Sequence, residues 1–344
     1  MLKAKQVKEI REHLENAKNP LFLFDNDQDG LCSFLLLQRF LGRGKGFPVT
    51  SFPDLDKNYF RKVEELKADY IFILDKPVVS EEFWKEVRQY NIPVVWIDHH
   101  MVQGDVPDFV NYYNVALNKP KTTEPVTALC YQITQKKDDL WLAVVGSVSD
   151  KFVPDFYDDF EKEFPELSCK YKDAFDIYYG SAIGKVAKIF GFGLKDTTTN
   201  VISMMKFLMK AKGPYDVLEE NPKNSRMHER FSDVDKRYSK LFTRALECLE
   251  GNLLFFQYSG ETSMSSNLAN ELSHRFPGKY IVVAYINGVK VNVSSRGEKV
   301  RDIFLKAIEG LEDARGGGHE KAVGGQVRAD DLEKFKKRMA KAVK

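Results

Sequence analysis

Short apolar runs and charged, amphipathic stretches alternate through the first hundred residues. The apolar runs have the length of buried strands and lie at 21–24, 48–52, 70–74 and 93–97. The stretches between them are predicted to be helices: an apolar one at 31–41, a charged one at 56–67 and a third at 80–89. Continuous apolar strands separated by helices are typical of a parallel sheet covered on both faces. We therefore expect an α/β domain in this half of the chain.

The pattern changes twice in the second half. From Pro125 it is mostly helical, and the glycine-free stretch at 221–249 predicts a long connecting helix. A second alternating unit begins at Asn252, where Asn287-Gly288 between two apolar runs predicts a β-hairpin. We expect three regions: an α/β domain at 1–190, a helical connector at 191–250 and a smaller α/β domain at 251–344.

Acidic side chains stand where three of the expected strands end. The cluster 25–30 (DNDQDG) closes the first strand, Asp75 the third, and Asp98 the fourth. In an open α/β sheet, ligands bind at this carboxyl edge. Carboxylates gathered there repel one another unless cations lie between them. The pattern favours a metal site over a solvated acidic turn, and a calcium-binding EF-hand is excluded because Leu36 stands where that loop needs glutamate.

Two histidines extend the acidic set. His99 and His100 follow Asp98 directly, so imidazole and carboxylate ligands are expected at the same edge of the sheet. This mixture suits manganese or magnesium better than zinc, which prefers thiolate and histidine. We expect Mn²⁺, with Mg²⁺ as the alternative.

Composition narrows the function classes. The net charge of +2 comes from 52 basic and 50 acidic residues, which argues against a surface coated with positive charge for long duplex DNA. A local basic groove remains open. The four cysteines have no paired spacing, which is typical of reduced thiols. No apolar run approaches the roughly 20 residues of a membrane span, and the N-terminus has no signal-peptide pattern. We expect a cytoplasmic protein without membrane contact.

The motifs resemble, in order and spacing, those of the DHH phosphoesterase superfamily. They are DNDQDG at 25–30, Asp75, DHH at 98–100, and the segment 146–150 that ends in Asp150. GGGH at 316–319, with Gly324-Gly325 after it, resembles the signature of the associated DHHA1 domain. The resemblance spans nearly the whole chain. It implies an N-terminal DHH catalytic domain with a parallel sheet flanked by helices, a helical connector and a smaller C-terminal α/β DHHA1 domain.

Within that superfamily, the acidic first motif is similar to that of the RecJ-type nucleases, above all the stand-alone archaeal ones. The second motif departs from the family, because Lys76 and Pro77 follow Asp75 where many relatives have a glycine. This departure leaves Asp75 as an expected ligand. It puts the adjacent loop, and with it the choice of substrate, in question.

The resemblance also implies roles for individual residues. Asp25 and Asp27 are expected to face a first metal ion, Asp29, His99 and Asp150 a second, and Asp75 to bridge the two. His100 would touch the substrate phosphate or orient a carboxylate. The implied catalytic set is Asp27, Asp29, Asp75, His99, His100 and Asp150. Two ions that share a water can direct hydroxide at phosphorus.

The glycine-rich segment of the DHHA1 region has two interpretations. It is either a flexible connector or a loop whose backbone N–H groups face a phosphate. In the second case we expect a substrate-binding group in this region, formed by Ser295, Arg296, Arg315, Gly316, Gly317, Gly318 and His319.

Three functions are compatible with these features. The first is a metal-dependent exonuclease that hydrolyses single-stranded DNA or RNA from an end. The second is a phosphoesterase for small substrates, namely short oligoribonucleotides, cyclic dinucleotides or a 3′-phosphonucleotide. The third is a non-catalytic scaffold in a replication or repair complex. Expected partners are single-stranded nucleic acid or a short oligonucleotide and a replication or repair protein such as a helicase. A homo-oligomer remains open.

Overall fold

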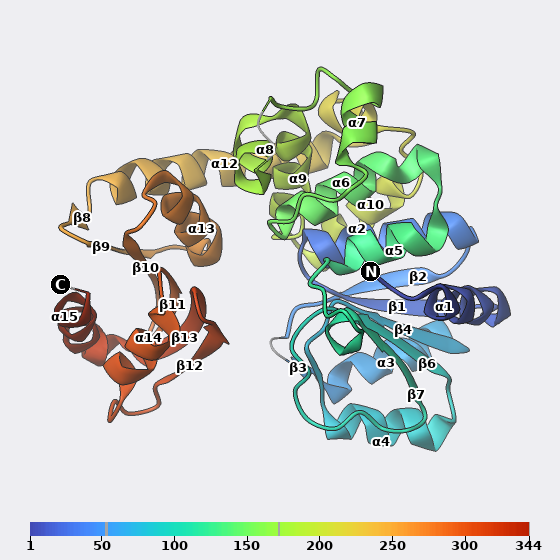
Figure 1. Cartoon of the computed structure of the whole chain (residues 1–344), viewed down its shortest axis with the longest axis horizontal. Helices are drawn as coiled ribbons and strands as arrows, with labels where there is room; N and C mark the ends of the chain where they lie inside the picture. The colour runs from blue at the N-terminus through green and yellow to red at the C-terminus, as the bar shows by residue number, and fades with distance from the viewer. Residues whose placement is uncertain (52–53, 171–172, 344) are drawn as a thin grey trace. The chain divides into compact units, whose positions relative to one another are not determined.

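The chain forms two compact units, Met1–Phe231 and Ser232–Lys344, and each has its own sheet (Figure 1). The computed structural model describes residues 1–51, 54–170 and 173–343. The boundary lies inside the long helix α12 (Ser225–Leu246), which occupies most of the stretch predicted to be a connecting helix. No helix within these described ranges is both long and apolar enough to cross a membrane.

The first unit is built on a five-stranded sheet in the order β2-β1-β4-β6-β7, with every neighbouring pair parallel. Its strands are β1 (Pro20–Asp25), β2 (Lys45–Val49), β4 (Tyr70–Leu74), β6 (Val94–Asp98) and β7 (Val110–Asn114). The expected parallel sheet is confirmed. β2 begins and ends earlier than the predicted 48–52, of which residue 52 lies outside the described residues. A second, two-stranded sheet pairs β3 (Asp54–Leu55) with β5 (Val78–Val79).

Helices cover both faces of the five-stranded sheet (Figure 1). Phe22 and Phe24 of β1 point into a core shared with α1 (Ala4–Asn16), α2 (Gln28–Leu41), α5 (Val126–Thr134) and α6 (Leu140–Ser149). Leu21 and Leu23 point to the other face, which α3 (Phe60–Leu66) and α4 (Glu81–Tyr90) cover. Successive strand residues face opposite sides, so an apolar run such as β1 fills both cores.

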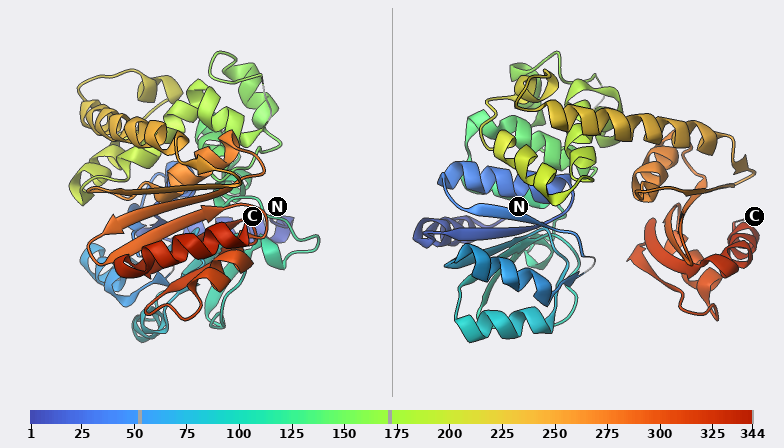
Figure 2. Two further views of the ribbon diagram at one scale, coloured as in Figure 1. Left: turned by 90° about the vertical axis from the view of Figure 1, so that its left-hand side faces the viewer. Right: turned by 180° about the vertical axis from the view of Figure 1, so that it is seen from behind.

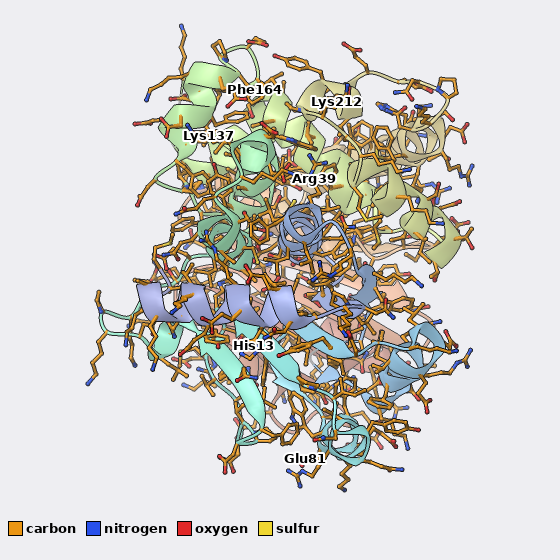
Figure 3. All side chains as sticks on the ribbon, turned by 90° about the vertical axis from the view of Figure 1, so that its right-hand side faces the viewer. His13, Arg39, Glu81, Lys137, Phe164 and Lys212 are labelled. Atoms are coloured by element: carbon orange, nitrogen blue, oxygen red, sulfur yellow. The ribbon has the colours of Figure 1, made fainter. Side chains whose placement is uncertain are left out.

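The remaining helices of the first unit follow α6 in the chain. They are α7 (Tyr157–Glu163), α8 (Ala174–Gly180), α9 (Ala182–Gly193), α10 (Thr198–Leu208) and α11 (Pro214–Leu218). A buried ion pair holds the C-terminal end of α2: Arg39 Nη2 lies 2.6 Å from Asp139 Oδ1. Arg39 Nη1 also donates to the carbonyl oxygens of Leu208 and Ala211, at 2.9 and 2.6 Å. Figure 3 shows Arg39 among these helices and His13 on α1, where its Nδ1 lies 2.5 Å from the hydroxyl of Tyr70.

The second unit has a six-stranded mixed sheet in the order β12-β13-β11-β10-β9-β8. Its strands are β8 (Leu249–Glu250), β9 (Leu253–Ser259), β10 (Tyr280–Asn287), β11 (Lys290–Arg296), β12 (Arg315–His319) and β13 (Ala322–Arg328). β10 and β11 form the predicted hairpin, in which Asn287 pairs with Lys290. The helices α14 (Val300–Ile308) and α15 (Leu332–Ala342) lie against the sheet (Figure 2), and their residues Phe304 and Phe335 belong to one core with it. The helix α13 (Ser265–Arg275) packs against β10 and β11.

The glycine-rich segment is a strand, so its interpretation as a flexible connector is wrong. Gly316 pairs with Gly325 of β13, and a Cβ atom on either would lie 2.4 Å from the ring of Phe304. These two glycines therefore let a large apolar side chain of α14 rest directly on the sheet. Packing, rather than turn formation, explains why glycine stands at both positions.

Candidate metal centre

Three neighbouring strands of the first unit end in acidic residues at one edge of the sheet. Asp25 is the last residue of β1, Asp75 follows β4 directly, and Asp98 is the last residue of β6. β1, β4 and β6 are adjacent in the sheet and parallel, so their carboxyl ends lie side by side. The sheet thus gathers residues that are 73 positions apart in the chain, as 25 and 98 show.

The turn after β1 starts helix α2 close to the strand. Asp27 is the N-cap of α2 and accepts a hydrogen bond from the backbone N–H of Gly30 at 2.9 Å. A Cβ atom on Gly30 would lie 2.3 Å from the carbonyl oxygen of Asp25, which leaves room only for glycine. The tight turn brings the side chains of Asp25 and Asp27 together.

Asp29 is buried and bound by a second helix. Its two carboxylate oxygens accept hydrogen bonds from the backbone N–H groups of Val126 (2.9 Å) and Thr127 (2.7 Å) in the first turn of α5. Burial raises the pKa of Asp29 well above its ordinary value, and the negative charges of Asp150 and Asp27 add to the effect. An anion at a helix N-terminus is favourable, so α5 offsets part of this cost.

Asp75 lies at the centre of the cluster and lacks a full set of partners. Its backbone is left-handed, with φ at 60°, and its side chain is buried. Its Oδ1 accepts no hydrogen bond from any residue that the structure describes. Burial raises the pKa of Asp75 well above its usual range, and the negative charges of Asp29 and Asp27 raise it further. A buried carboxylate oxygen without a donor calls for a cation.

His99 and His100 have different neighbours. His99 Nε2 lies 3.4 Å from Asp75 Oδ1 and 3.7 Å from Asp150 Oδ2, and burial lowers its pKa, which favours the neutral ring that binds metal. His100 Nδ1–H donates to Asp98 Oδ1 at 2.8 Å. Burial opposes protonation of His100, but the hydrogen bond and the charge of Asp98 outweigh it and raise the pKa.

Asp98 has hydrogen-bond partners of its own, His100 and Asn114. It is fully buried, and its Oδ2 accepts a hydrogen bond from Asn114 Nδ2 of β7 at 3.1 Å. Asp98 therefore orients the ring of His100. Asp150, at the end of α6, is the most open acid of the group; the loss of hydration raises its pKa, and the nearby His99 works in the opposite direction.

These residues form overlapping sets of three whose ligand atoms lie within 4.8 Å of one another. The sets are Asp25, Asp27 and Asp75; Asp29, His99 and Asp150; and Asp75, His99 and His100. Carboxylate oxygens with imidazole nitrogens suit Mn²⁺ or Mg²⁺, and the unpartnered Oδ1 of Asp75 lies where two of the sets meet. The donor set fits a divalent metal centre. It brings together all six residues that the sequence nominates as metal ligands.

Three lysines lie near this centre that the sequence did not nominate. Lys76 Nζ donates to Asp25 Oδ1 at 2.8 Å. The charges of Lys151 and Lys195 act on Asp150 and Asp27, respectively, and burial lowers the pKa of Lys195. Lys76 and Lys151 adjoin predicted ligands in the sequence, which is a usable signal. Lys195, in the segment after α9, has none.

In the second unit, the predicted phosphate-binding residues are only partly brought together. Arg296 of β11 and His319 of β12 are both in register with Ala322 of β13, so they lie in the same row of the sheet. Asn270 Oδ1 of α13 accepts a hydrogen bond from Arg296 Nε at 2.7 Å. Arg315 lies at the other end of β12, in register with Gln326.

The remaining residues of that group have differing surroundings. Ser295 is fully buried, and its hydroxyl has no partner among the described residues. Gly316 packs under Phe304, and a Cβ atom on Gly317 would meet open space. Gly318 has a positive φ of 138°, and a Cβ atom there would lie 2.4 Å from the carbonyl oxygen of Ala322.

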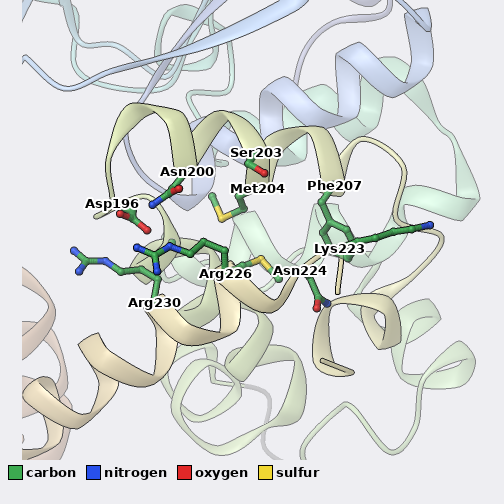
Figure 4. Close-up of a pocket in the computed structure, with 11 residues that line it drawn as sticks. Asp196, Asn200, Ser203, Met204, Phe207, Lys223, Asn224, Arg226 and Arg230 are labelled. Carbon is green, nitrogen blue, oxygen red and sulfur yellow. The ribbon is translucent and has the colours of Figure 1, made fainter. Parts of the chain in front are cut away.

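A shallow pocket lies elsewhere in the first unit, between α9, α10 and the start of α12 (Figure 4). Asp196, Asn200 and Arg230 line it, and none of the residues nominated from the sequence does. The pocket is therefore separate from the acidic cluster.

Known structures share this fold across the chain. The match to RecJ from Thermus thermophilus in complex with Mn²⁺ covers 99% of this chain and 55% of the RecJ chain, with 14% sequence identity and a TM-score of 0.71. The match to a DHH domain described as a member of the s1p family of ribosomal proteins covers 98% of this chain and 89% of that domain's chain, with 15% sequence identity and a TM-score of 0.70. The match to an exonuclease RecJ bound to manganese covers 100% of this chain and 95% of that RecJ chain, with 14% sequence identity and a TM-score of 0.66.

The chain thus spans about half the length of the Thermus RecJ chain. No curated protein sequence matches it. Residues 250–344, which make up most of the second unit, match the DHHA1 domain family. The C-terminal part of the chain is therefore similar to the DHHA1 domain family, and the fold of the whole chain is similar to that of RecJ.

Proposed function

We propose that this protein is a metal-dependent phosphodiesterase that acts as a RecJ-like exonuclease on single-stranded DNA or RNA. The observation that carries the proposal is the set formed by Asp29, His99 and Asp150, with Asp75 beside it. Carboxylates and an imidazole whose pKa burial lowers gather at one edge of the sheet, and two RecJ structures with a similar fold hold manganese. Mn²⁺ is the proposed ion, and Mg²⁺ is the alternative.

The chain's own residues have distinct tasks in this proposal. Asp29, His99, Asp150 and Asp75 hold metal, with Asp27 beside them. Divalent metal bound there would lower the pKa of a water molecule and neutralise charge on the phosphoryl oxygens. Because the α5 N-terminus fixes Asp29, its oxygens are positioned before any ion binds.

His100 orients the substrate. Asp98 holds the Nδ1–H of His100, which fixes the direction of the ring and leaves the second ring nitrogen for a phosphate oxygen. Lys151 and Lys195 add positive charge near Asp150 and Asp27, where a phosphodiester backbone would approach. In the second unit, Arg296 and His319 bind a further phosphate of the nucleic acid.

A time course with manganese on end-labelled single-stranded DNA and RNA 20-mers, beside a dinucleotide, tests the proposal. We expect stepwise shortening of a 20-mer from one end and no cleavage by the Asp75→Ala variant. Because the net charge is only +2, the runner-up is a small-nucleotide phosphoesterase, which would cleave the dinucleotide and leave the 20-mers intact. Cleavage of neither substrate would contradict catalysis and favour a scaffold in a replication or repair complex.

A further inference from the structure

Lys76 is a fully buried lysine whose ammonium group lies inside the acidic cluster. Its Nζ donates to Asp25 Oδ1 at 2.8 Å and to the carbonyl oxygen of Ser51 at 2.9 Å. The side chain has no exposed surface. A lysine is rarely buried without a charged partner, and here the partner is a residue expected to bind metal.

The backbone holds this ammonium in place. Asp75 has a left-handed backbone, which turns the chain directly after β4. Pro77 restricts the residue before it to an extended conformation. The carbonyl oxygen of Lys76 accepts a hydrogen bond from Trp96 Nε1 at 2.9 Å, which ties the turn to β6. The lysine therefore cannot swing into solvent without unpacking this turn.

The ammonium affects the metal sets unequally. Asp25 belongs to the set with Asp27 and Asp75, so one of its two oxygens is already engaged by a fixed positive charge. A divalent ion on the other oxygen would share one carboxylate with that charge, and like charges disfavour each other. The set of Asp29, His99 and Asp150 does not include Asp25.

We propose that the Lys76 ammonium takes the place of one of two divalent ions, so that the chain holds a single Mn²⁺ tightly at Asp29, His99 and Asp150. The inference rests on the metal centre of the proposed function and specifies its composition. In the absence of substrate, the side of the cluster formed by Asp25 and Asp27 binds Mn²⁺ only weakly. Lys76 supplies a permanent positive charge there, independent of the metal concentration.

Counting bound Mn²⁺ on the full chain tests this directly, by calorimetric titration and by metal analysis after dialysis. We expect one tight ion in the wild-type protein. Lys76→Met removes the charge at similar volume and should bind a second ion at least tenfold more tightly than the wild type does. Lys76→Arg should still hold one.

Lys136 offers a matched control. It also lies near a buried acid, with Nζ 3.6 Å from Asp139 Oδ2, but outside the cluster. Lys136→Met should therefore leave the number of tight ions at one. Two tight ions in the wild-type protein, or a single one in folded Lys76→Met, would overturn the inference.

Asp25→Asn decides the question if Lys76→Met does not fold. Because Asp25 binds the Lys76 ammonium and not the tight ion, the Asp25→Asn variant should keep the single tight Mn²⁺. Loss of that ion from the variant would count against the inference. The proposed function fails separately. Two tight ions together with cleavage of a 20-mer would refute only the role of Lys76, whereas a wild-type chain that binds no Mn²⁺ would refute both.

Discussion

The carboxylate of Asp29 accepts a hydrogen bond from the backbone N–H of Thr127 at 2.7 Å, and the hydroxyl of Thr127 donates to the carbonyl oxygen of Asp29 at 2.9 Å. An expected metal ligand on α2 thereby also holds the N-terminus of α5, whose own N-cap, Pro125, makes no side-chain bond. The metal centre and the hydrophobic core of the first unit therefore share a structural element. Stability and metal binding should be separable by mutation at different acids.

Asp29 and Asp150 should differ in their effect on the metal-free protein. Asp29→Ala leaves two buried N–H donors of α5 without acceptors, and we expect the free energy of unfolding to fall by about 2–4 kcal/mol. Asp150→Ala removes a repulsive charge at the open side of the cluster and should leave this free energy unchanged or raise it. Urea unfolding in the presence of a chelator measures both. Equal losses would show that Asp29 has no special structural role.

Gly146 of α6 lies against the same threonine. A Cβ atom there would lie 2.2 Å from Thr127 Oγ1, so Gly146→Ala must push α5 away from Asp29. Overpacking of this kind costs about 1–3 kcal/mol, and we also expect weaker Mn²⁺ binding. Gly180→Ala is the control, because a Cβ atom at Gly180 meets nothing within 4 Å. Unchanged melting temperature and Mn²⁺ affinity in Gly146→Ala would contradict the packing described.

The Arg39–Asp139 pair should be among the most sensitive in the first unit. Arg39→Met leaves Asp139 buried, with the more distant Lys136 as its remaining charged neighbour, and breaking such a pair costs about 3–5 kcal/mol. The exposed pair Arg61–Glu65 provides the comparison, since Arg61→Met should leave the melting temperature as it is. Thermal unfolding of the two variants checks this. Similar melting temperatures would mean that the buried pair contributes little.

His319 should affect substrate binding without affecting the metal. It is exposed at the end of β12, in the same row as Arg296. Loss of one hydrogen bond to a charged phosphate, worth about 1.5 kcal/mol, should raise KM about tenfold in His319→Ala. Arg315→Ala, at the opposite end of the strand, should raise it less. The proposed phosphate contact would be refuted by an unaltered KM in His319→Ala, measured on a single-stranded oligonucleotide.

The sequence predicted the arrangement of Asp25, Asp75 and Asp98 because strand direction alone decides it. Apolar runs fix the strands, and parallel pairing places all their carboxyl ends at one edge. Strand β7 was missed: its sequence, VNYYN, mixes polar and aromatic residues, as suits the edge of a sheet. Its Asn114 nevertheless helps to hold Asp98.

Two other features depend on contacts that the residues concerned do not indicate by themselves. The direction of the Lys76 side chain follows from the left-handed backbone of Asp75, and no local sequence pattern predicts that conformation. The strand at 315–319 has weak strand preference, because glycine has no side chain to pack. It is favoured by pairing with β13 and by the ring of Phe304, which lies on the face that Gly316 and Gly325 leave free. β13 follows two residues later in the chain, whereas Phe304 comes from the preceding helix α14.

Anomalous diffraction from crystals grown with Mn²⁺, recorded at the manganese edge, tests the central claim most directly. We predict a strong peak within coordination distance of His99 Nε2 and the carboxylates of Asp29 and Asp150, with Asp75 turned toward it. A map without a peak at His99, in crystals that contain manganese elsewhere, would contradict the metal centre and with it the proposed phosphodiesterase.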